Sequence, residues 1–396
     1  MRVLLFTNLF PTRAETTRGI FTLQLAQELA RLCDLSVAVP LPWFPEGALG
    51  RCLLPRHAQQ FGGIGREWSH EGIRARYLRY PLLPRLSERY HPRLMELGVQ
   101  HWLESEHARQ PWQVINAHWL FPDGVAAARI ARRLRIPVVL TALGCDANEF
   151  LQDAAKGPQI IDALRYAGAV TAVSSALGDA LLRAGVPEKR LTIIPNGVDT
   201  LSFQPRNRAE CRRVLGLPVD CRLVVCVSRH SPEKGVGYLI DAAPALFALN
   251  PATHIALVGD GPQRQELESR VRKLGLGDRV HFAGSVAYEA VAQWLGAADV
   301  SCIPSLREGH PNAAMESLAS GRPIVASRVG ALPGMISDKL GALVSPGDAG
   351  ELAAALGRAI EQPWDPDAIA ASVRSASWSA AAKKYFSAAQ SVAAHT

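Results

Sequence analysis

The stretch ADVSCIPSLREGHPNAAMESLASGRPIVAS, residues 298–327, contains two short apolar runs separated by a polar loop and an amphipathic segment. The runs Val300–Ile303 and Ile324–Ala326 have the length and composition of buried strands. Pro311 suits the first turn of a helix between them. Strand, helix and strand in this order are typical of a βαβ unit with parallel strands. The stretch therefore predicts an α/β fold.

The same alternation of apolar runs and amphipathic helices extends through the rest of the chain. We expect further strands at Arg2–Thr7, Leu35–Val39, Val114–Ala117, Pro137–Thr141, Ala169–Val173, Leu223–Ser228, His254–Val258, Val280–Phe282 and Ala342–Val344, with helices such as Ile20–Leu32 and Gly124–Leu134 between them. Residues 195–220, rich in Pro, Asn and Arg, separate the two series. We therefore predict two Rossmann-like doubly wound domains, residues 1–198 and 199–375. A last helix around Ser379–Ala389, within residues 376–396, could cross back to the first domain.

Composition excludes several classes of protein. The 396 residues are 48% hydrophobic and 20% charged, which excludes a disordered chain, a coiled coil and a collagen-like fibre. No apolar stretch reaches the roughly 18 residues of a membrane span, and the first ten residues read as a strand rather than a signal peptide. The seven cysteines contain no CxxC pair that would indicate a disulfide framework or a zinc site. We expect a cytoplasmic protein.

The net charge of +7 is concentrated in an Arg-rich segment, Arg51–Arg93. Aromatic residues are interspersed in it, namely Phe61, Trp68, Tyr77, Tyr80 and Tyr90. One interpretation is a face for an anionic membrane surface or an anionic acceptor, with the protein peripheral at the inner membrane face. The other is a solvated connecting segment. No nucleic-acid-binding signature accompanies the charge, so we do not expect a nucleic-acid partner.

Two carboxylates surround the expected helix start at Pro311. Glu308 lies in the preceding loop and Glu316 on the second turn. The N–H groups of Asn312, Ala313 and Ala314 would point out of the helix N-terminus, which is a favourable anion site. Carboxylates on both sides of an anion site suit a ligand with hydroxyls at its ends and phosphate in its middle, such as a nucleotide sugar. A second interpretation is two ordinary surface glutamates.

Cations and polar residues follow other expected strands. Arg229 and Lys234 come after Leu223–Ser228, where open α/β sheets bind ligands, and two cations there can neutralise a diphosphate. Gly19 at a helix start permits close approach of a phosphate or sugar. Further along the first domain, His118, Asp146 and Asn148 also follow strands, although an isolated His is more often structural than catalytic. The single GDG at residues 259–261 is not a full GxGxxG, so we infer no nicotinamide or flavin cofactor.

Taken in order, these motifs resemble retaining GT-B glycosyltransferases of glycosyltransferase family 4. The resemblance covers nearly the whole chain: IPNGVDTLSFQP at 194–205, Arg229 with Lys234, GDGPQRQEL at 259–267, VHFAGSVAYEAVAQWLGAADV at 280–300, and the pair Glu308 and Glu316. RGIF at 18–21 and AHWLFPDG at 117–124 are similar to the branch with teichuronic-acid and exopolysaccharide transferases. The fold implied is two Rossmann-like domains facing a central cleft.

The resemblance implies a role for each candidate residue. Arg229 and Lys234 would hold the donor diphosphate, and Glu316 the ribose hydroxyls. Glu308 would contact the transferred sugar, and His118 would lie beside the anomeric carbon and the acceptor. Other donor contacts would come from Gly19, Asn312 and Ala313, with the base near Ala283–Ser285, and acceptor contacts from Trp119, Asp146 and Asn148. Such enzymes need neither a metal nor another cofactor.

The implied reaction transfers a hexosyl unit from a nucleoside-diphosphate sugar to a hydroxyl of a glycan or lipid-linked acceptor, with retention, in cell-surface polysaccharide biosynthesis. Donor base, donor sugar and acceptor stay open. A phosphorylase of the same fold would need a Lys-centred pyridoxal phosphate site, which the sequence does not indicate. Two further functions stay open: a nucleotide-sugar epimerase of the same two-domain fold and a catalytically silent sugar-nucleotide-binding protein.

Overall fold

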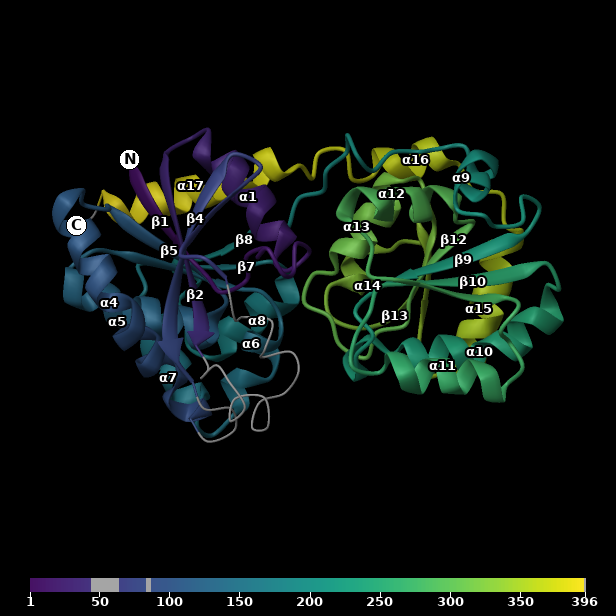
Figure 1. Ribbon diagram of the computed structural model, residues 1–396, viewed down its shortest axis with the longest axis horizontal. Coiled ribbons are helices and arrows are strands. Elements are labelled where there is room, and N and C mark those ends of the chain that lie inside the picture. The colour runs from purple at the N-terminus through teal and green to yellow at the C-terminus, as the bar shows by residue number, and fades with distance from the viewer. Residues whose placement is uncertain (44–63, 83–86, 395–396) are drawn as a thin grey trace. The chain divides into compact units, whose positions relative to one another are not determined.

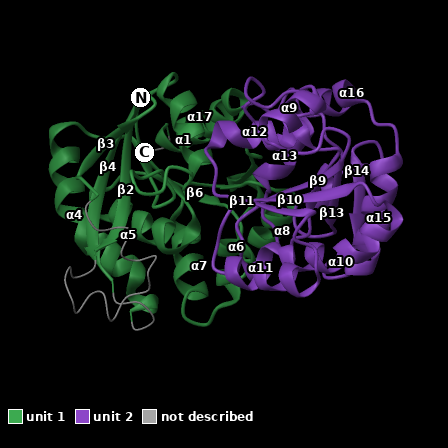
Figure 2. Ribbon diagram, turned by 45° about the vertical axis from the view of Figure 1, so that its right-hand side comes forward, with its two compact units in different colours: residues 1–196, 378–396 green, residues 197–377 purple. Residues whose placement is uncertain are grey.

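Two sheets organise the part of the chain that the computed structural model describes, residues 1–43, 64–82 and 87–394 (Figure 1). Each sheet is the centre of one compact unit (Figure 2). Unit 1 comprises residues 1–196 and 378–396, and unit 2 comprises residues 197–377. The chain passes between the units after Asn196 and after Ser377, where we had expected boundaries after residues 198 and 375.

The sheet of unit 1 has the strand order β3-β4-β2-β1-β5-β6-β7-β8. All neighbours are parallel except β3 and β4. The strands are β1 Arg2–Phe6, β2 Asp34–Trp43, β3 Glu67–His70, β4 Ile73–Pro81, β5 Val114–His118, β6 Val138–Ala142, β7 Ala169–Ala172 and β8 Leu191–Ile193. From β4 to β7 the sheet winds outward in both directions from β1 and β5, so the carboxyl ends of these two strands form a topological switch point.

Amphipathic helices cover the sheet of unit 1. They are α1 Ile20–Ala30, α4 His91–Arg109, α5 Val125–Leu134, α6 Cys145–Asn148, α7 Gly157–Tyr166, α8 Ser175–Arg183 and α17 Trp378–Ala393. The last of these comes from the C-terminal end of the chain and lies beside α1 (Figure 1), where Trp378, Ala382 and Tyr385 pack against Leu25 and Leu29. Unit 1 is therefore completed by residues that follow unit 2 in the sequence.

The Arg-rich segment does not have the structure that we expected. Within its described part, Glu67–His70 and Ile73–Pro81 form an antiparallel hairpin on the sheet rather than a connection. The Tyr77 and Tyr80 side chains are buried in the core, so they cannot form a surface with the arginines. Residues 44–63 and 83–86, which include Phe61, lie outside the described residues. The solvated connection is therefore wrong for Glu67–Pro81, and Tyr77 and Tyr80 cannot belong to an aromatic surface. A basic face that includes the half-buried Trp68 stays a prediction.

Unit 2 has a wholly parallel sheet of order β11-β10-β9-β12-β13-β14. Its strands are β9 Arg222–Val227, β10 Thr253–Val258, β11 Val280–Gly284, β12 Val300–Ile303, β13 Ile324–Ser327 and β14 Gly341–Val344. Its helices are α9 Arg208–Val214, α10 Val236–Leu249, α11 Arg264–Lys273, α12 Tyr288–Ala297, α13 Asn312–Ala319, α14 Leu332–Met335, α15 Ala349–Glu361 and α16 Pro366–Ala371. The order is that of the dinucleotide-binding Rossmann sheet, with its switch point between β9 and β12. The predicted doubly wound architecture is confirmed in both units.

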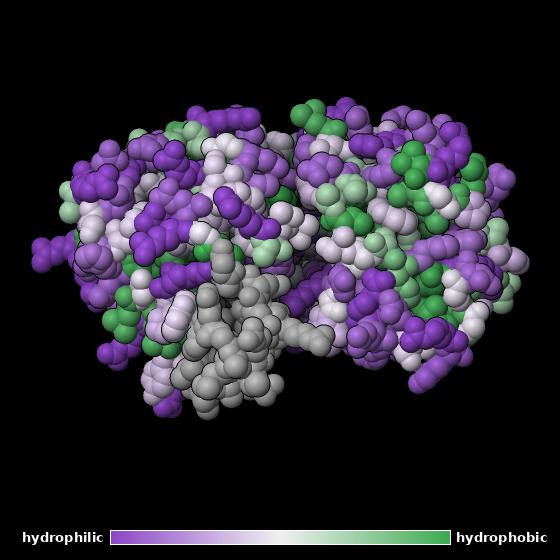
Figure 3. All heavy atoms as spheres, in the orientation of Figure 1, coloured by the Kyte–Doolittle hydropathy of each residue, from purple (hydrophilic) through white to green (hydrophobic). Residues whose placement is uncertain are grey.

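The face of the molecule that Figure 3 shows is a mixture of polar and apolar residues. In the view of Figure 3, polar residues prevail and apolar ones occur in small separate groups over both units. None of the helices in the described ranges combines the length and the apolar character that crossing a membrane would require.

Candidate functional site

A cavity of about 180 Å³ lies at the switch point of unit 2. Residues from the ends of β9 and β12, from the loops that follow them and from the start of α13 line it. Five of the predicted residues are among them: Arg229, Lys234, Glu308, Asn312 and Ala313. The helices that follow these two central strands, α10 and α13, belong to different core clusters on the two faces of the sheet, so the loops before them leave an opening that a ligand can enter.

An ion pair forms the centre of this cavity. The Lys234 ammonium Nζ is 2.7 Å from Glu308 Oε1, and the Ser305 hydroxyl donates to the same oxygen at 2.7 Å. The Glu308 side chain is only 6% exposed, against 27% for Lys234. A buried carboxylate is stable here because an ammonium and a hydroxyl both bind it. Sequence reasoning missed Ser305, whose place three residues before Glu308 in the same loop is the only signal for it.

A tight turn brings Lys234 to this position. Pro232–Lys234 forms one 3-10 turn that ends at Gly235, which has φ +62°. A Cβ at Gly235 would lie 2.1 Å from the carbonyl oxygen of Pro304, so only glycine allows the two loops to approach this closely. The Leu306 N–H also donates to the Glu233 carbonyl at 2.8 Å. The loops after β9 and β12 are thus held together by backbone contacts.

The helix N-terminus faces the cavity nearly as predicted. Pro311 is the N-cap residue, and α13 begins at Asn312 rather than at the proline. Asn312 and Ala313 line the cavity at the positive end of the helix dipole. The Ala314 N–H donates to the Pro311 carbonyl at 3.0 Å, so the prediction that it points outward as an open donor is wrong.

Arg229 adds a second positive charge to the rim. Its side chain is exposed, in contrast to that of Lys234, and it lines the same cavity. The charged residues that line the cavity are the cations Arg229 and Lys234 and the carboxylate Glu308, so the lining carries a net positive charge that favours an anion. A diphosphate fits this site, because the cations can neutralise its charge and the N–H groups of the helix N-terminus can donate hydrogen bonds to its oxygens.

Glu316 lies one turn further along α13 and outside the residues that line the cavity. It is 9% exposed. Burial raises the pKa of its carboxyl to about 7, and a hydrogen bond with the Tyr288 side chain partly opposes this effect. Tyr288 is a neighbour that sequence reasoning missed, since it belongs to α12 and is distant in the sequence. Hydrogen bonds from ligand hydroxyls would stabilise a carboxylate that has so little contact with solvent.

His118 ends β5 at the switch point of unit 1. Its side chain is 1% exposed, and burial lowers the pKa of the imidazole to about 3, so the ring is neutral at pH 7. No hydrogen-bond partner of its Nε2 atom lies among the described residues. The next residue, Trp119, has φ +80°, an uncommon conformation for a side chain of its size, and its ring lies 6.3 Å from that of Phe150.

Gly19 and Asp146 are both explained by contacts inside unit 1. Gly19 has φ +60°, and a Cβ there would lie 2.2 Å from the Leu9 carbonyl oxygen. Asp146 is fully buried, and its two carboxylate oxygens accept hydrogen bonds from the backbone N–H groups of Leu120, Leu143, Gly144 and Ala147. This arrangement gives Asp146 a structural role in fixing the loops after β5 and β6. Asn148, at the end of α6, is exposed.

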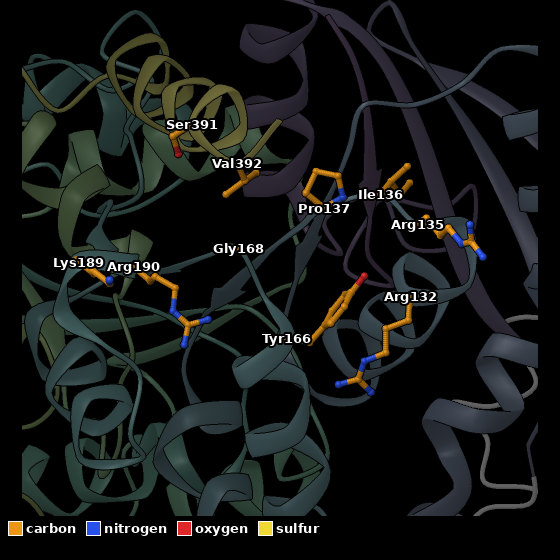
Figure 4. Close-up of a pocket in the computed structure, with 10 residues that line it drawn as sticks. All are labelled: Arg132, Arg135, Ile136, Pro137, Tyr166, Gly168, Lys189, Arg190, Ser391 and Val392. Atoms are coloured by element: carbon orange, nitrogen blue, oxygen red, sulfur yellow. The ribbon is translucent and has the colours of Figure 1, made fainter. Parts of the chain in front are cut away.

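A larger groove of about 770 Å³ lies in unit 1 at the amino ends of β6, β7 and β8, the edge opposite to His118 (Figure 4). Arg132, Arg135, Lys189 and Arg190 line it together with Tyr166. Arg190 donates to the carbonyls of Arg165 and Ala167 at the end of α7, and Arg132 pairs with Asp162 at 2.7 Å. Cations commonly satisfy the last carbonyls of helices, so part of this charge is explained without a ligand.

Potential metal ligands are dispersed. Over residues 1–43, 64–82 and 87–394, no three side chains of His, Cys, Asp or Glu converge in a way that could hold a metal ion.

Two family models match the chain, one on each unit. The model described as "Glycosyltransferase Family 4" matches residues 19–201, and the one described as "Glycosyl transferases group 1" matches residues 221–362.

Named relatives agree with these matches. The chain is 28% identical over 382 residues to the putative teichuronic acid biosynthesis glycosyltransferase TuaC of Bacillus subtilis, covering 93% of this chain and 91% of the relative. It is 30% identical over 296 residues to the D-inositol 3-phosphate glycosyltransferase of Thermobifida fusca, covering 69% of this chain and 68% of the relative. A match to the MMP alpha-(1->4)-mannosyltransferase of Mycolicibacterium hassiacum, 36% identical over 196 residues, covers 49% of this chain and spans 45% of that relative.

Solved structures show the same fold along the whole chain. Sucrose-phosphate synthase from Thermosynechococcus elongatus superimposes with a TM-score of 0.78 at 24% identity, covering 100% of this chain and 99% of that one. Anabaena HepE in complex with UDP-glucose gives a TM-score of 0.66 at 23% identity, covering 100% and 98%. The two family models and the Thermobifida fusca relative cover both Rossmann-like units, so the chain belongs to glycosyltransferase family 4, and the solved structures show that it has the GT-B fold.

Proposed function

We propose that this glycosyltransferase transfers a hexosyl unit from a nucleoside-diphosphate sugar to a hydroxyl of a glycan or lipid-linked acceptor, with retention of the anomeric configuration. The observation that carries the proposal is the cavity of unit 2, where the pair of Lys234 and Glu308 lies beside Arg229 and the N-terminus of α13. Cations, helix N–H groups and a carboxylate together match a diphosphate joined to a sugar.

The donor would be held by unit 2. Lys234, Arg229 and the N-terminus of α13 would bind the diphosphate and stabilise the charge that develops on it as the glycosidic bond breaks. Glu308 would accept hydrogen bonds from hydroxyls of the transferred sugar, and Glu316 from the ribose. The fixed positive groups can supply this stabilisation without a metal ion, so we propose that catalysis needs neither a metal nor another cofactor.

The relatives support the choice of substrates to test first. HepE was solved with UDP-glucose, which makes UDP-sugars the first donors to examine. TuaC, which matches over 93% of this chain, is named for teichuronic acid biosynthesis, and this supports a role in cell-surface polysaccharide assembly. We place the activity in the cytoplasm, in keeping with the unpaired state of the described cysteines. A lipid-linked acceptor at the inner membrane face is to be tested beside a soluble glycan.

Unit 1 would bind the acceptor. His118 would lie beside the anomeric carbon as a neutral imidazole, with Trp119 and Asn148 near the acceptor and Asp146 supporting their loops. For retention we favour a same-face reaction, in which the departing phosphate helps to deprotonate the acceptor hydroxyl. No residue has been identified as the nucleophile that double displacement would require. Trapping a glycosyl-enzyme adduct would overturn this part of the proposal.

The test is a titration with nucleoside-diphosphate sugars in a buffer without metal, followed by thermal unfolding and by release of nucleoside diphosphate. A true donor raises the unfolding temperature and is slowly hydrolysed. Lys234→Ala and Glu316→Ala should abolish both effects, whereas Lys273→Ala, at an exposed position of the same unit, should retain them.

Three outcomes would contradict the proposal. If no sugar nucleotide raises the unfolding temperature, the donor site is wrong. An epimerised sugar nucleotide in the absence of acceptor would indicate an epimerase, and tight donor binding without turnover for any acceptor would indicate a silent binding protein. Retention is tested separately from the anomeric proton coupling of the product, and metal independence from the rate after treatment with a chelator.

A further inference from the structure

Three polar residues form a row across the sheet of unit 1. His118 on β5 is in register with Thr141 on β6, and Thr141 is in register with Thr171 on β7. Residues in register on parallel strands point to the same face, so the three side chains lie next to one another. All are at most 1% exposed. The Thr141 and Thr171 hydroxyls are hydrogen-bonded to each other at 2.8 Å.

Tyr385, from helix α17, covers this row. Its ring centroid is 5.1 Å from that of His118, with an angle of 38° between the ring planes. Its hydroxyl is hydrogen-bonded to both Thr141 and Thr171. The tyrosine is 1% exposed, so the contact between the two rings is shielded from water. The hydroxyl adds to the packing that holds the ring in place, and the ring limits how the imidazole can turn.

The helix that carries Tyr385 is itself firmly attached to unit 1. On one side of Tyr385, Trp378 and Ala382 pack against Leu25, Leu29 and Ile194. Further along the helix, Ala389 and Val392 pack against β1, β5 and β6. The His118 Nε2 atom has no hydrogen-bond partner among the described residues, so no hydrogen bond at that atom orients the ring, and the Tyr385 ring packs against it.

We propose that Tyr385 is a positioning residue for His118, and that the C-terminal helix α17 acts in catalysis through this contact without touching substrate. The proposal rests on the function proposed above for His118. Tyr385 holds the neutral imidazole in one orientation at the end of β5. Loss of the ring leaves space beside the imidazole, and the histidine then samples orientations that do not serve transfer.

The activity test is a double-mutant cycle in the full-length enzyme. Tyr385→Leu is expected to lower kcat for transfer at least tenfold and to leave the donor Kd within twofold, because the donor site is in unit 2. In a His118→Ala background the same change should have no further effect on kcat, because Tyr385 acts only through the histidine. Tyr385→Phe keeps the ring but not the hydroxyl, so it should restore most of the lost activity.

The control is Val392→Ala, which removes buried volume from the same helix seven residues beyond Tyr385, about 10 Å along the axis. It should lower the unfolding temperature and leave kcat unchanged. If Tyr385→Leu behaves like Val392→Ala, or lowers kcat equally in the His118→Ala background, the tyrosine is merely structural and the proposal is overturned.

A second readout does not depend on activity. The proton NMR signal of the His118 imidazole can be assigned by its loss in His118→Ala. Because an aromatic ring lies 5.1 Å away, this signal should shift in Tyr385→Leu and stay in place in Val392→Ala. An unchanged signal would overturn the positioning contact. A shifted signal in a protein that transfers no sugar would instead support the contact and reject the function proposed for the enzyme.

Discussion

Lys234 and Glu308 neutralise each other in the cavity of unit 2, with 2.7 Å between the ammonium and a carboxylate oxygen. A lysine ammonium has three donors, so it can keep this contact and still bind a phosphate oxygen. Lys234→Met should therefore weaken binding of a nucleoside diphosphate at least tenfold, and should change binding of the corresponding nucleoside less than twofold. Isothermal titration with both ligands measures the difference.

The control for this prediction is Lys273→Met, which removes the same charge from an exposed position of unit 2. It should leave both affinities unchanged, because Lys273 is exposed and is not among the residues that line the cavity. Equal weakening of nucleoside and nucleoside diphosphate by Lys234→Met would show that the lysine maintains the cavity but does not bind phosphate.

Glu316 gives the second prediction for a single residue. The pKa of its carboxyl is about 7 in the folded protein against an ordinary 4.5, because burial disfavours the charged form. Between these values the native protein retains a proton that the unfolded chain has released, so stability falls as the pH rises through this window. Glu316→Gln removes the effect, and without ligand it should be more stable than the wild type at pH 8 by up to about 3 kcal/mol.

Denaturant unfolding at pH 4.5 and pH 8 measures this difference, which should nearly vanish at the lower pH. Glu266→Gln, a change at an exposed glutamate of unit 2, should have no such pH dependence. A stability gain of Glu316→Gln that is the same at both values would mean that the carboxyl does not titrate in this range.

At the scale of the element, the turn between β9 and α10 determines where Lys234 lies. Gly235→Ala should destabilise the protein by more than the left-handed conformation of an alanine costs, because the new Cβ would also clash with the Pro304 carbonyl. It should also weaken donor binding, since the loop must move. Gly275→Ala is matched to it, with φ +66° and no atom within 4 Å of the new Cβ, and should cost about 1–2 kcal/mol without affecting the donor.

Thermal unfolding and donor titration of the two variants test this prediction. Equal losses of stability, with equal donor affinities, would show that the approach of Gly235 to Pro304 is unimportant for the site.

The elements also show what could be predicted from the sequence. The strands Val300–Ile303 and Ile324–Ser327 were predicted to within one residue, because buried parallel strands read as continuous apolar runs. Strand β4, Ile73–Pro81, was missed because its arginines suggest a solvated segment. In the structure Arg76 pairs with Glu67, and Arg79 donates to backbone carbonyls. Only tertiary partners on other segments make such a strand possible, and a single sequence does not reveal them.

In the candidate site, too, contacts that follow from the strand pattern could be predicted, whereas contacts that depend on tertiary packing could not. Lys234 and Glu308 could be predicted as neighbours, because both follow central strands whose carboxyl ends meet at one edge. The buried place of Asp146 could not, since its four N–H donors come from loops after two strands, and local sequence does not specify how these loops fold over the carboxylate. Tyr385 was likewise beyond prediction, because its contact with His118 joins residues from opposite ends of the chain.

At the scale of the whole molecule, the two units differ in how the chain builds them. Unit 2 is continuous, whereas part of the sheet of unit 1 is covered by α17, Trp378–Ala393, which follows unit 2 in the sequence. Ending the chain after Ser377 would remove Trp378, Tyr385 and Val392 from the core, and each such buried side chain contributes about 1.5–3 kcal/mol. Since a typical domain is stable by about 5–15 kcal/mol, we expect unit 1 to be severely destabilised and unit 2 to be preserved.

Calorimetry separates these effects, because a protein of two units need not unfold in one transition. In the shortened chain, the unfolding transition of unit 1 should disappear or move to a much lower temperature. The transition of unit 2 should remain, and a nucleoside diphosphate should still raise its temperature, since the ligand stabilises only the unit that binds it. Donor binding would then survive while transfer is lost. If the shortened chain instead kept both transitions and full activity, α17 would be dispensable for unit 1, and the packing of its aromatic residues against Leu25 and Leu29 would contribute little to the fold.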